Sequence, residues 1–73
     1  MFSVEVTYPG QYYPELDSKL ENFMGQYAGA SGMGFGQRDL SFGSYELELD
    51  ALNMASRIEV AFPEVATRIV NWD

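Results

Sequence analysis

SGMGFGQRDLSF, residues 31–42, holds the two middle strands of the chain. Within it, glycine takes every second position from 32 to 36, and Met33 and Phe35 lie between the glycines. Because successive side chains of a strand point to opposite sides, this spacing predicts a strand within residues 28–37 that buries Met33 and Phe35. Glycine weakens the interior of a strand, so we expect this one at a sheet edge or beside a closely approaching backbone.

The second half of the same stretch predicts a hairpin. Gln37 and Arg38 are the expected connection between the two strands. Leu40 and Phe42 then continue as the next strand, with polar residues between and before them. At Gly43 the apolar positions change parity, which indicates a bulge or the end of the strand.

The N-terminal part predicts a strand followed by a helix. Apolar and polar residues alternate over residues 2–8, which is typical of a half-buried strand, and a proline–glycine pair then favours a turn. Pro14 suits the first turn of a helix, and Gly25 or Gly29 suits its end. One apolar stripe follows the helical period: Leu16, Leu20, Phe23, Met24 and Tyr27.

The C-terminal part predicts a second helix and a last strand. Asp50 is a good N-cap for the helix, and Pro63 ends it, because the residue before proline disfavours helical geometry. Residues 65–72 then form the last strand, whose parity depends on whether Arg68 faces solvent. If it does, the residues that face the helices are Val65, Thr67 and Ile69.

The expected order is therefore strand, helix, strand, strand, helix, strand. This order predicts a single α+β domain over residues 1–73 with a ferredoxin-like βαββαβ layout. Two helices would cover one face of a four-stranded antiparallel sheet. The other face would be mostly polar.

Composition narrows the possible functions. The 73 residues include no cysteine and no histidine, which excludes disulfides, thiolate metal sites and a histidine general base. Apolar residues make up 47% of the chain, too many for a disordered protein. The N-terminus lacks a signal-peptide pattern, and no apolar run approaches the roughly 20 residues that span a bilayer, so we expect a cytoplasmic protein without a cofactor.

Net charge points to the kind of partner. Eleven acidic and four basic residues give a formal charge of −7. This sign repels nucleic-acid phosphates and anionic lipids and favours proteins with basic surfaces. We therefore expect no direct binding to nucleic acid and no binding to membranes.

We considered three kinds of binding or catalytic site, and the sequence lacks part of the motif that each one requires. A phosphate-binding loop needs glycines followed directly by a helix, whereas strands are expected on both sides of residues 32–36. An RNA-recognition motif needs exposed aromatic residues on the third strand, where Phe42 shares the parity of Leu40 and should be buried. Carboxylates at every second position of residues 46–50 would suit a cation, but no calcium-loop spacing or nucleophile accompanies them.

The acidic residues suggest a contact surface instead. They gather on the first helix and at the entry to the second: Glu15, Asp17, Glu21, Glu46, Glu48 and Asp50. Together they would present a negative face to the basic, nucleic-acid-binding groove of another protein, although a plain solvated face is the alternative interpretation. Trp72 is a further candidate contact because tryptophan is enriched at interface hot spots, unless it covers the open end of the sheet.

The hairpin and the second helix also carry a resemblance. The hairpin residues concerned are Gly32, Gly34, Phe35, Gly36, Arg38, Asp39 and Phe42. With the A-x-x-I-x-x-x-F-P pattern from Ala55 to Pro63, the whole chain resembles short, acidic, ferredoxin-like proteins of bacteria and their phages, mainly of unknown function. In size and acidity it is also similar to phage-encoded inhibitors of bacterial defence, including anti-CRISPR proteins. That similarity implies no functional residue.

Three functions follow as hypotheses. The first is a non-enzymatic, phage-encoded inhibitor or modulator whose acidic face blocks a basic nucleic-acid-binding surface, as anti-CRISPR proteins that mimic DNA do. The alternative is a small structural or self-assembling accessory protein that dimerises through an edge strand or the open sheet face. A third class, an enzyme or ligand sensor, would need a pocket lined by the glycine hairpin or by Tyr8, Tyr12 or Tyr13.

Overall fold

Six elements follow one another in the predicted order. A computed structural model describes residues 1–34 and 36–72, so the expected burial of Phe35 lies outside the described residues. The elements are β1 (Phe2–Pro9), α1 (Pro14–Met24), β2 (Ala30–Gly34), β3 (Gln37–Tyr45), α2 (Glu48–Ala61) and β4 (Ala66–Asn71). No helix among the described residues is long and apolar enough to cross a bilayer.

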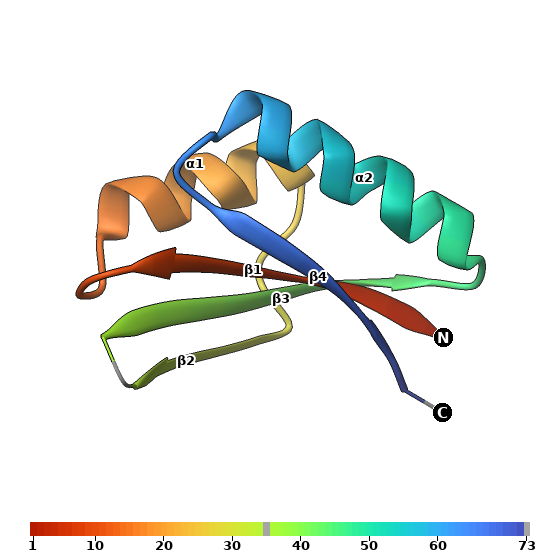
Figure 1. The fold of residues 1–73 in the computed structure, drawn as a ribbon, viewed down its shortest axis with the longest axis horizontal. Coiled ribbons are helices and arrows are strands. Elements are labelled where there is room, and N and C mark those ends of the chain that lie inside the picture. Colours follow the sequence, from red (N-terminus) through yellow and green to blue (C-terminus); the bar gives the residue numbers. More distant parts are fainter. Residues whose placement is uncertain (35, 73) are drawn as a thin grey trace.

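The four strands form one antiparallel sheet in the order β2-β3-β1-β4. Both helices lie on the same side of this sheet, and β2 lies at its margin (Figure 1). The predicted α+β, ferredoxin-like arrangement is therefore confirmed. Because β1 and β3 are the inner strands, their apolar side chains are the ones that both helices can cover.

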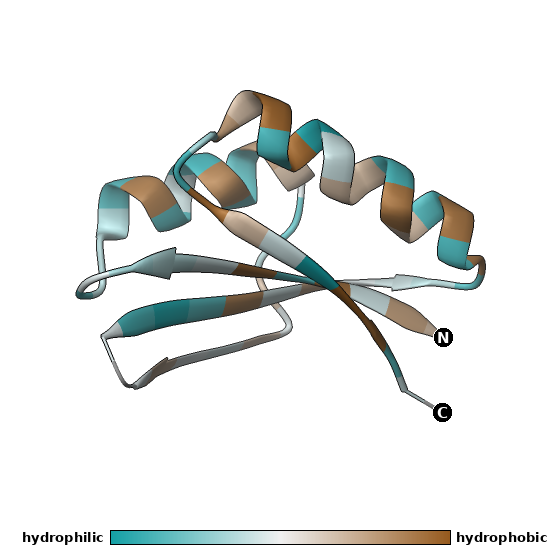
Figure 2. Ribbon diagram, in the orientation of Figure 1, coloured by the Kyte–Doolittle hydropathy of each residue, from teal (hydrophilic) through white to brown (hydrophobic). Residues whose placement is uncertain are grey.

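The core lies between the sheet and the helices. It contains Val4, Val6, Tyr8, Leu16, Leu20, Leu40, Phe42, Ala51, Ala55, Ile58 and Val65. Along both helices, apolar and polar segments alternate in the way that an amphipathic helix requires (Figure 2). Val65 and Ile69 belong to the core or pack against it, whereas Arg68 is exposed and pairs with Glu5, so the last strand takes the parity expected for an Arg68 that faces solvent.

A bulge interrupts the pairing of β1 with β3, as the change of parity at Gly43 indicates. Phe2 pairs with Tyr45, but Val4 pairs with Phe42, so the register shifts between them. Gly43 has φ +147°, and a Cβ added there would lie 3.0 Å from the Cα of Ser3. Glycine is required here because both the backbone angle and the neighbouring strand exclude a side chain.

Two expectations for the glycine hairpin are wrong. Gly34 pairs with Gln37 and Met33 pairs with Arg38, so the connection precedes Gln37 and both expected turn residues belong to β3. Met33 is 52% exposed rather than buried. It shares the helix side of the sheet with Arg38, but β2 lies at the sheet margin, where none of the described strands lies on its outer side.

Helix ends follow the sequence signals in three places, including the start of α1 at Pro14, and depart from them in one. Gly25 caps α1 in the left-handed conformation, and α2 ends at Ala61 before Pro63. α2 begins at Glu48 rather than after Asp50, so Asp50 lies in the first helical turn instead of at the N-cap. The carboxylates of residues 46–50 therefore do not lie along one extended segment, because β3 ends at Tyr45 and α2 begins at Glu48.

Candidate functional site

The connection from β3 to α2 exposes leucines between carboxylates. We call this surface the acidic leucine segment; it consists of Glu46, Leu47, Glu48, Leu49, Asp50 and Leu52. The side chains of Leu47, Leu49 and Leu52 are 61%, 65% and 46% exposed, and all three carboxylates are exposed. Such a group of exposed apolar side chains with a charged surround is typical of a contact surface.

Basic residues are absent from the sequence around this segment. Residues 39–56 contain no lysine or arginine, and no ion pair among the described residues involves the carboxylates of the acidic leucine segment. Two of these carboxylates, Glu48 and Asp50, lie in the first turn of α2, where a negative charge stabilises the helix by about 0.3–1 kcal/mol. They therefore support the helix as well as presenting charge to solvent.

Asp17 is not part of an exposed acidic face, contrary to the expectation from its helix position. It is only 7% exposed. Its Oδ1 accepts a hydrogen bond of 2.6 Å from the hydroxyl of Tyr8, and its Oδ2 accepts one of 2.8 Å from Nη2 of Arg38. The polar side of α1 at this position faces inward because the buried end of β1 and the start of β3 supply partners for a carboxylate.

These three side chains form a buried polar network under the N-terminus of α1. The hydroxyl of Tyr8 also accepts a hydrogen bond of 3.0 Å from the backbone N–H of Tyr13, which fixes the start of the helix. Burial, and then donation to Asp17, raise the pKa of Tyr8 above its ordinary value. The hydrogen bond to Asp17 likewise raises the pKa of Arg38, whose guanidinium lies 4.8 Å from the ring centre of Tyr12.

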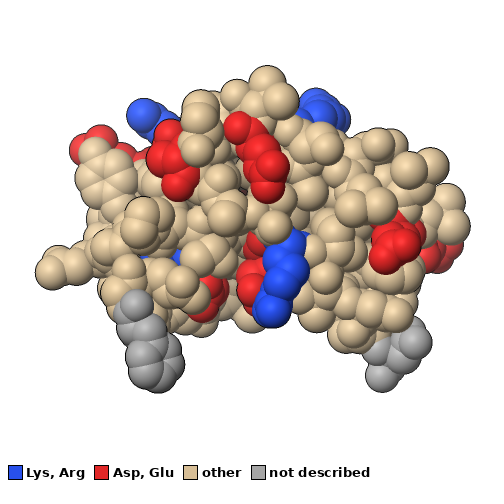
Figure 3. Space-filling model, viewed as in Figure 1, with Lys and Arg blue, Asp and Glu red and all other residues tan. Residues whose placement is uncertain are grey.

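The remaining acidic residues of α1 make local contacts. Glu15 accepts a hydrogen bond of 3.3 Å from the hydroxyl of Tyr13, and Glu21 accepts one of 3.2 Å from the backbone N–H of Ala28. α1 and α2 begin at opposite ends of the molecule (Figure 1). Glu15 in the first turn of α1 and Glu48 in the first turn of α2 are therefore far apart. On the face that Figure 3 shows, acidic side chains form separate patches.

Trp72 lies beyond the last strand and is 50% exposed. Its backbone N–H donates a hydrogen bond of 2.9 Å to the carbonyl oxygen of Met1. Together with Val70 it borders a shallow hollow beside Gly43. Phe2 pairs with both Tyr45 and Asn71, so Trp72 lies at the same end of the sheet as Glu46.

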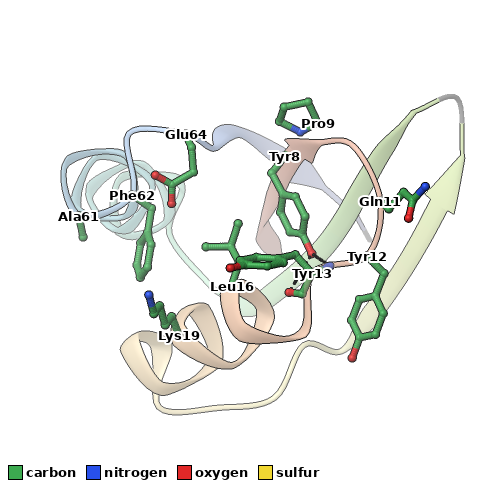
Figure 4. A pocket seen from close by; sticks show the side chains of 10 residues that line it. All are labelled: Tyr8, Pro9, Gln11, Tyr12, Tyr13, Leu16, Lys19, Ala61, Phe62 and Glu64. Carbon is green, nitrogen blue, oxygen red and sulfur yellow. Dashed lines mark hydrogen bonds between the residues drawn. The ribbon is translucent and has the colours of Figure 1, made fainter.

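A cavity of about 780 Å³ lies between the start of α1 and the end of α2. It is lined by Tyr8, Pro9, Gln11, Tyr12, Tyr13, Leu16, Lys19, Ala61, Phe62 and Glu64. Tyr13 and Leu16 lie across from Phe62, with Lys19 and Glu64 on the Phe62 side (Figure 4). Three tyrosines within six residues of the β1–α1 turn were the sequence signal for it, but the contribution of α2 depends on the fold.

Comparison with known proteins does not assign a function to this chain. No family model, no curated protein and no solved structure matches it. Among the described residues, no group of three or more acidic side chains is placed to hold a metal ion. Any functional assignment therefore has to come from the surface of the chain itself.

Proposed function

We propose that this chain is a non-enzymatic protein-binding inhibitor or modulator that docks through the acidic leucine segment. The partner is a protein with a basic, nucleic-acid-binding surface. The observation that carries this proposal is that three exposed leucines and three exposed carboxylates lie within residues 46–52, and that no ion pair among the described residues involves these carboxylates. The leucines supply apolar area to bury, and the carboxylates select a basic partner.

Charge elsewhere on the molecule supports a basic partner. The chain carries −7 overall, so its field attracts a cationic surface from a distance and accelerates the encounter. The leucines then decide how long the complex lasts, because buried apolar contacts slow dissociation. Small size and strong acidity also support the narrower form of the proposal, a phage-encoded inhibitor of a bacterial defence complex of the anti-CRISPR kind.

The test compares two variants in a pull-down from bacterial lysate at low salt, followed by elution with increasing salt. Leu47→Ser combined with Leu49→Ser removes apolar area from side chains that are 61% and 65% exposed, so the fold should keep its stability. Val60→Ser is the matched control, because Val60 is 83% exposed on the same helix but outside the acidic leucine segment. We expect the double variant to lose a nucleic-acid-binding partner that the control retains.

The carboxylates make a second prediction for the same complex. Screening weakens contacts between exposed charges, so the partner should elute as salt rises, and added nucleic acid should compete for its basic surface. Equal capture by the double variant and the wild-type chain would refute docking through the leucines. Elution that does not depend on salt would refute the choice of a basic partner.

Small-molecule binding is a second candidate function, favoured by the tyrosine-lined cavity. Its volume of about 780 Å³ is in the range of pockets that hold drug-sized ligands. Native mass spectrometry of the purified chain would show a bound molecule as added mass. Tyr13→Ala should remove that mass and Tyr27→Ala should not, since Tyr27 does not line the cavity.

A further inference from the structure

β2 is a sheet edge without the usual protection against pairing with another chain. Its five residues, ASGMG, include neither a charged residue nor proline, and β3 is its only partner among the described strands. The opposite edge, β4, carries Arg68, whose side chain is 71% exposed. Because charge and proline are the common means of blocking edge-to-edge association, only the β2 edge is open to it.

Neither the backbone angle nor the described neighbouring atoms explain why β2 has glycine at two positions. Gly32 and Gly34 do not have a positive φ, and a Cβ added at either would meet nothing within 4 Å. Gly43 differs in both respects, since its backbone angle and its distance to Ser3 require glycine. Glycine inside a strand costs about 0.5–1 kcal/mol relative to alanine and marks places where another backbone approaches closely. No backbone of the described residues lies within 4 Å of a Cβ added at either position, so the space beside them is free for another chain.

Space for such an approach exists on both sides of the sheet. On the open face β2 presents only Ala30, Gly32 and Gly34, which leave that face almost bare beside Ser41 and Asp39. On the helix side, Met33 is 52% exposed. In Figure 1, β2 lies at the margin of the sheet farthest from α2. A strand laid beside β2 would therefore meet neither a helix nor a bulky side chain on the open face.

Charge indicates that this strand comes from a second copy of the chain. Residues 22–37 form the longest uncharged stretch of the sequence, and β2 lies within it. Elsewhere a net charge of −7 makes two copies repel each other, and a basic partner would be drawn to the carboxylates rather than to this edge. The β2 edge is thus the part of the surface where two like-charged copies meet with the least repulsion.

We propose that two copies pair antiparallel through β2 about a two-fold axis, which joins their sheets into one of eight strands. The same short strand then serves both copies, as a two-fold interface requires. Assembly stops at the dimer, because the outer edges are then the two β4 strands with their exposed Arg68. An interface of five residues per copy is small, so the dimer forms only at high protein concentration.

The test is sedimentation equilibrium at physiological salt over low micromolar to millimolar protein, with two variants that add the same charge. Met33→Glu places like charges beside the pairing strands and should weaken dimerisation about tenfold or more. Val60→Glu adds the same charge on α2, at a residue that is 83% exposed, and should leave dimerisation within about threefold of the wild-type value. Neither substitution alters the acidic leucine segment, so failure here leaves the proposed partner contact to its own test.

Amide hydrogen exchange of the unmodified chain gives a readout that does not depend on how a variant folds. Between low micromolar and millimolar protein, exchange should slow at residues 30–34, while exchange in β4 should stay unchanged. A wild-type chain that remains monomeric at millimolar concentration would overturn the proposal. A dimer that leaves exchange at residues 30–34 unchanged, or that Met33→Glu and Val60→Glu weaken equally, would also overturn it.

Discussion

Asp17 shows how the position of one carboxylate decides whether it is a contact residue or a structural one. It lies in the first turn of α1 like Glu15, but its side chain faces Tyr8 and Arg38 instead of solvent. The side chains of Arg38 and Asp17 are 14% and 9% exposed, so the ion pair is largely shielded from water. Removing one partner leaves the other charge buried without compensation, which is the costly case for an ion pair.

Asp17→Asn should therefore lower the free energy of unfolding by about 3 kcal/mol, because it leaves the guanidinium of Arg38 without a counter-charge. Glu15→Gln is the control; its carboxylate is exposed, and the change should be within about 0.5 kcal/mol. Urea denaturation followed by circular dichroism measures both. Equal stability of the two variants would show that Asp17 is not held in this network.

At the scale of the element, the strands need glycine for different reasons at different positions. In β3, Gly43 makes the bulge and lies against β1, whereas Gly32 in β2 lies in open space with an ordinary backbone angle. In the sequence, each has a serine on one side and an apolar residue on the other, and only the change of parity at Gly43 sets that glycine apart. Only the register of the neighbouring strand makes one of them indispensable to the folded chain.

Gly43→Ala should destabilise the protein by about 1–3 kcal/mol, since the new Cβ would lie 3.0 Å from the Cα of Ser3 at a φ of +147°. Gly32→Ala should leave the stability of the monomer unchanged or raise it by about 0.5–1 kcal/mol, because a strand disfavours glycine. Urea denaturation at low micromolar protein compares the two without contribution from self-association. A larger loss for Gly32→Ala than for Gly43→Ala would contradict the described register.

On the scale of the whole molecule, surplus negative charge acts on stability as well as on the choice of partner. Two of the four basic residues are paired, Arg38 with Asp17 and Arg68 with Glu5. Lys19 and one other basic residue remain to offset all the other carboxylates. Self-repulsion of this kind destabilises a compact chain and is screened by salt.

Stability should accordingly rise with ionic strength. Between about 10 mM and about 300 mM sodium chloride, we expect the free energy of unfolding to increase by about 1 kcal/mol. The measurement is a series of urea titrations at fixed pH and low protein concentration. A sodium sulfate series at matched ionic strength separates screening from effects of the individual ion. Stability that falls as salt rises would mean that the two ion pairs outweigh the repulsion.

Much of the architecture can be read from local patterns along the chain. Alternation over residues 2–8, the apolar stripe from Leu16, the glycine end at Gly25 and the stop at Pro63 each reflect a backbone preference or a side-chain period. These properties depend on near neighbours in sequence. They were sufficient to predict the order of the six elements. They left two alternatives each for the parity of the last strand and for the break at Gly43, which the strand register resolved.

Tertiary structure decided which side chains are covered and which remain for contacts. Met33 has the spacing of a buried residue but lies on an edge strand, and Asp17 has the position of a surface residue but lies beside Arg38 from β3. The cavity beside Phe62 likewise needs the ends of two helices far apart in sequence. Burial depends on neighbours brought together by strand order, and the spacing of residues along one segment carries no information about them.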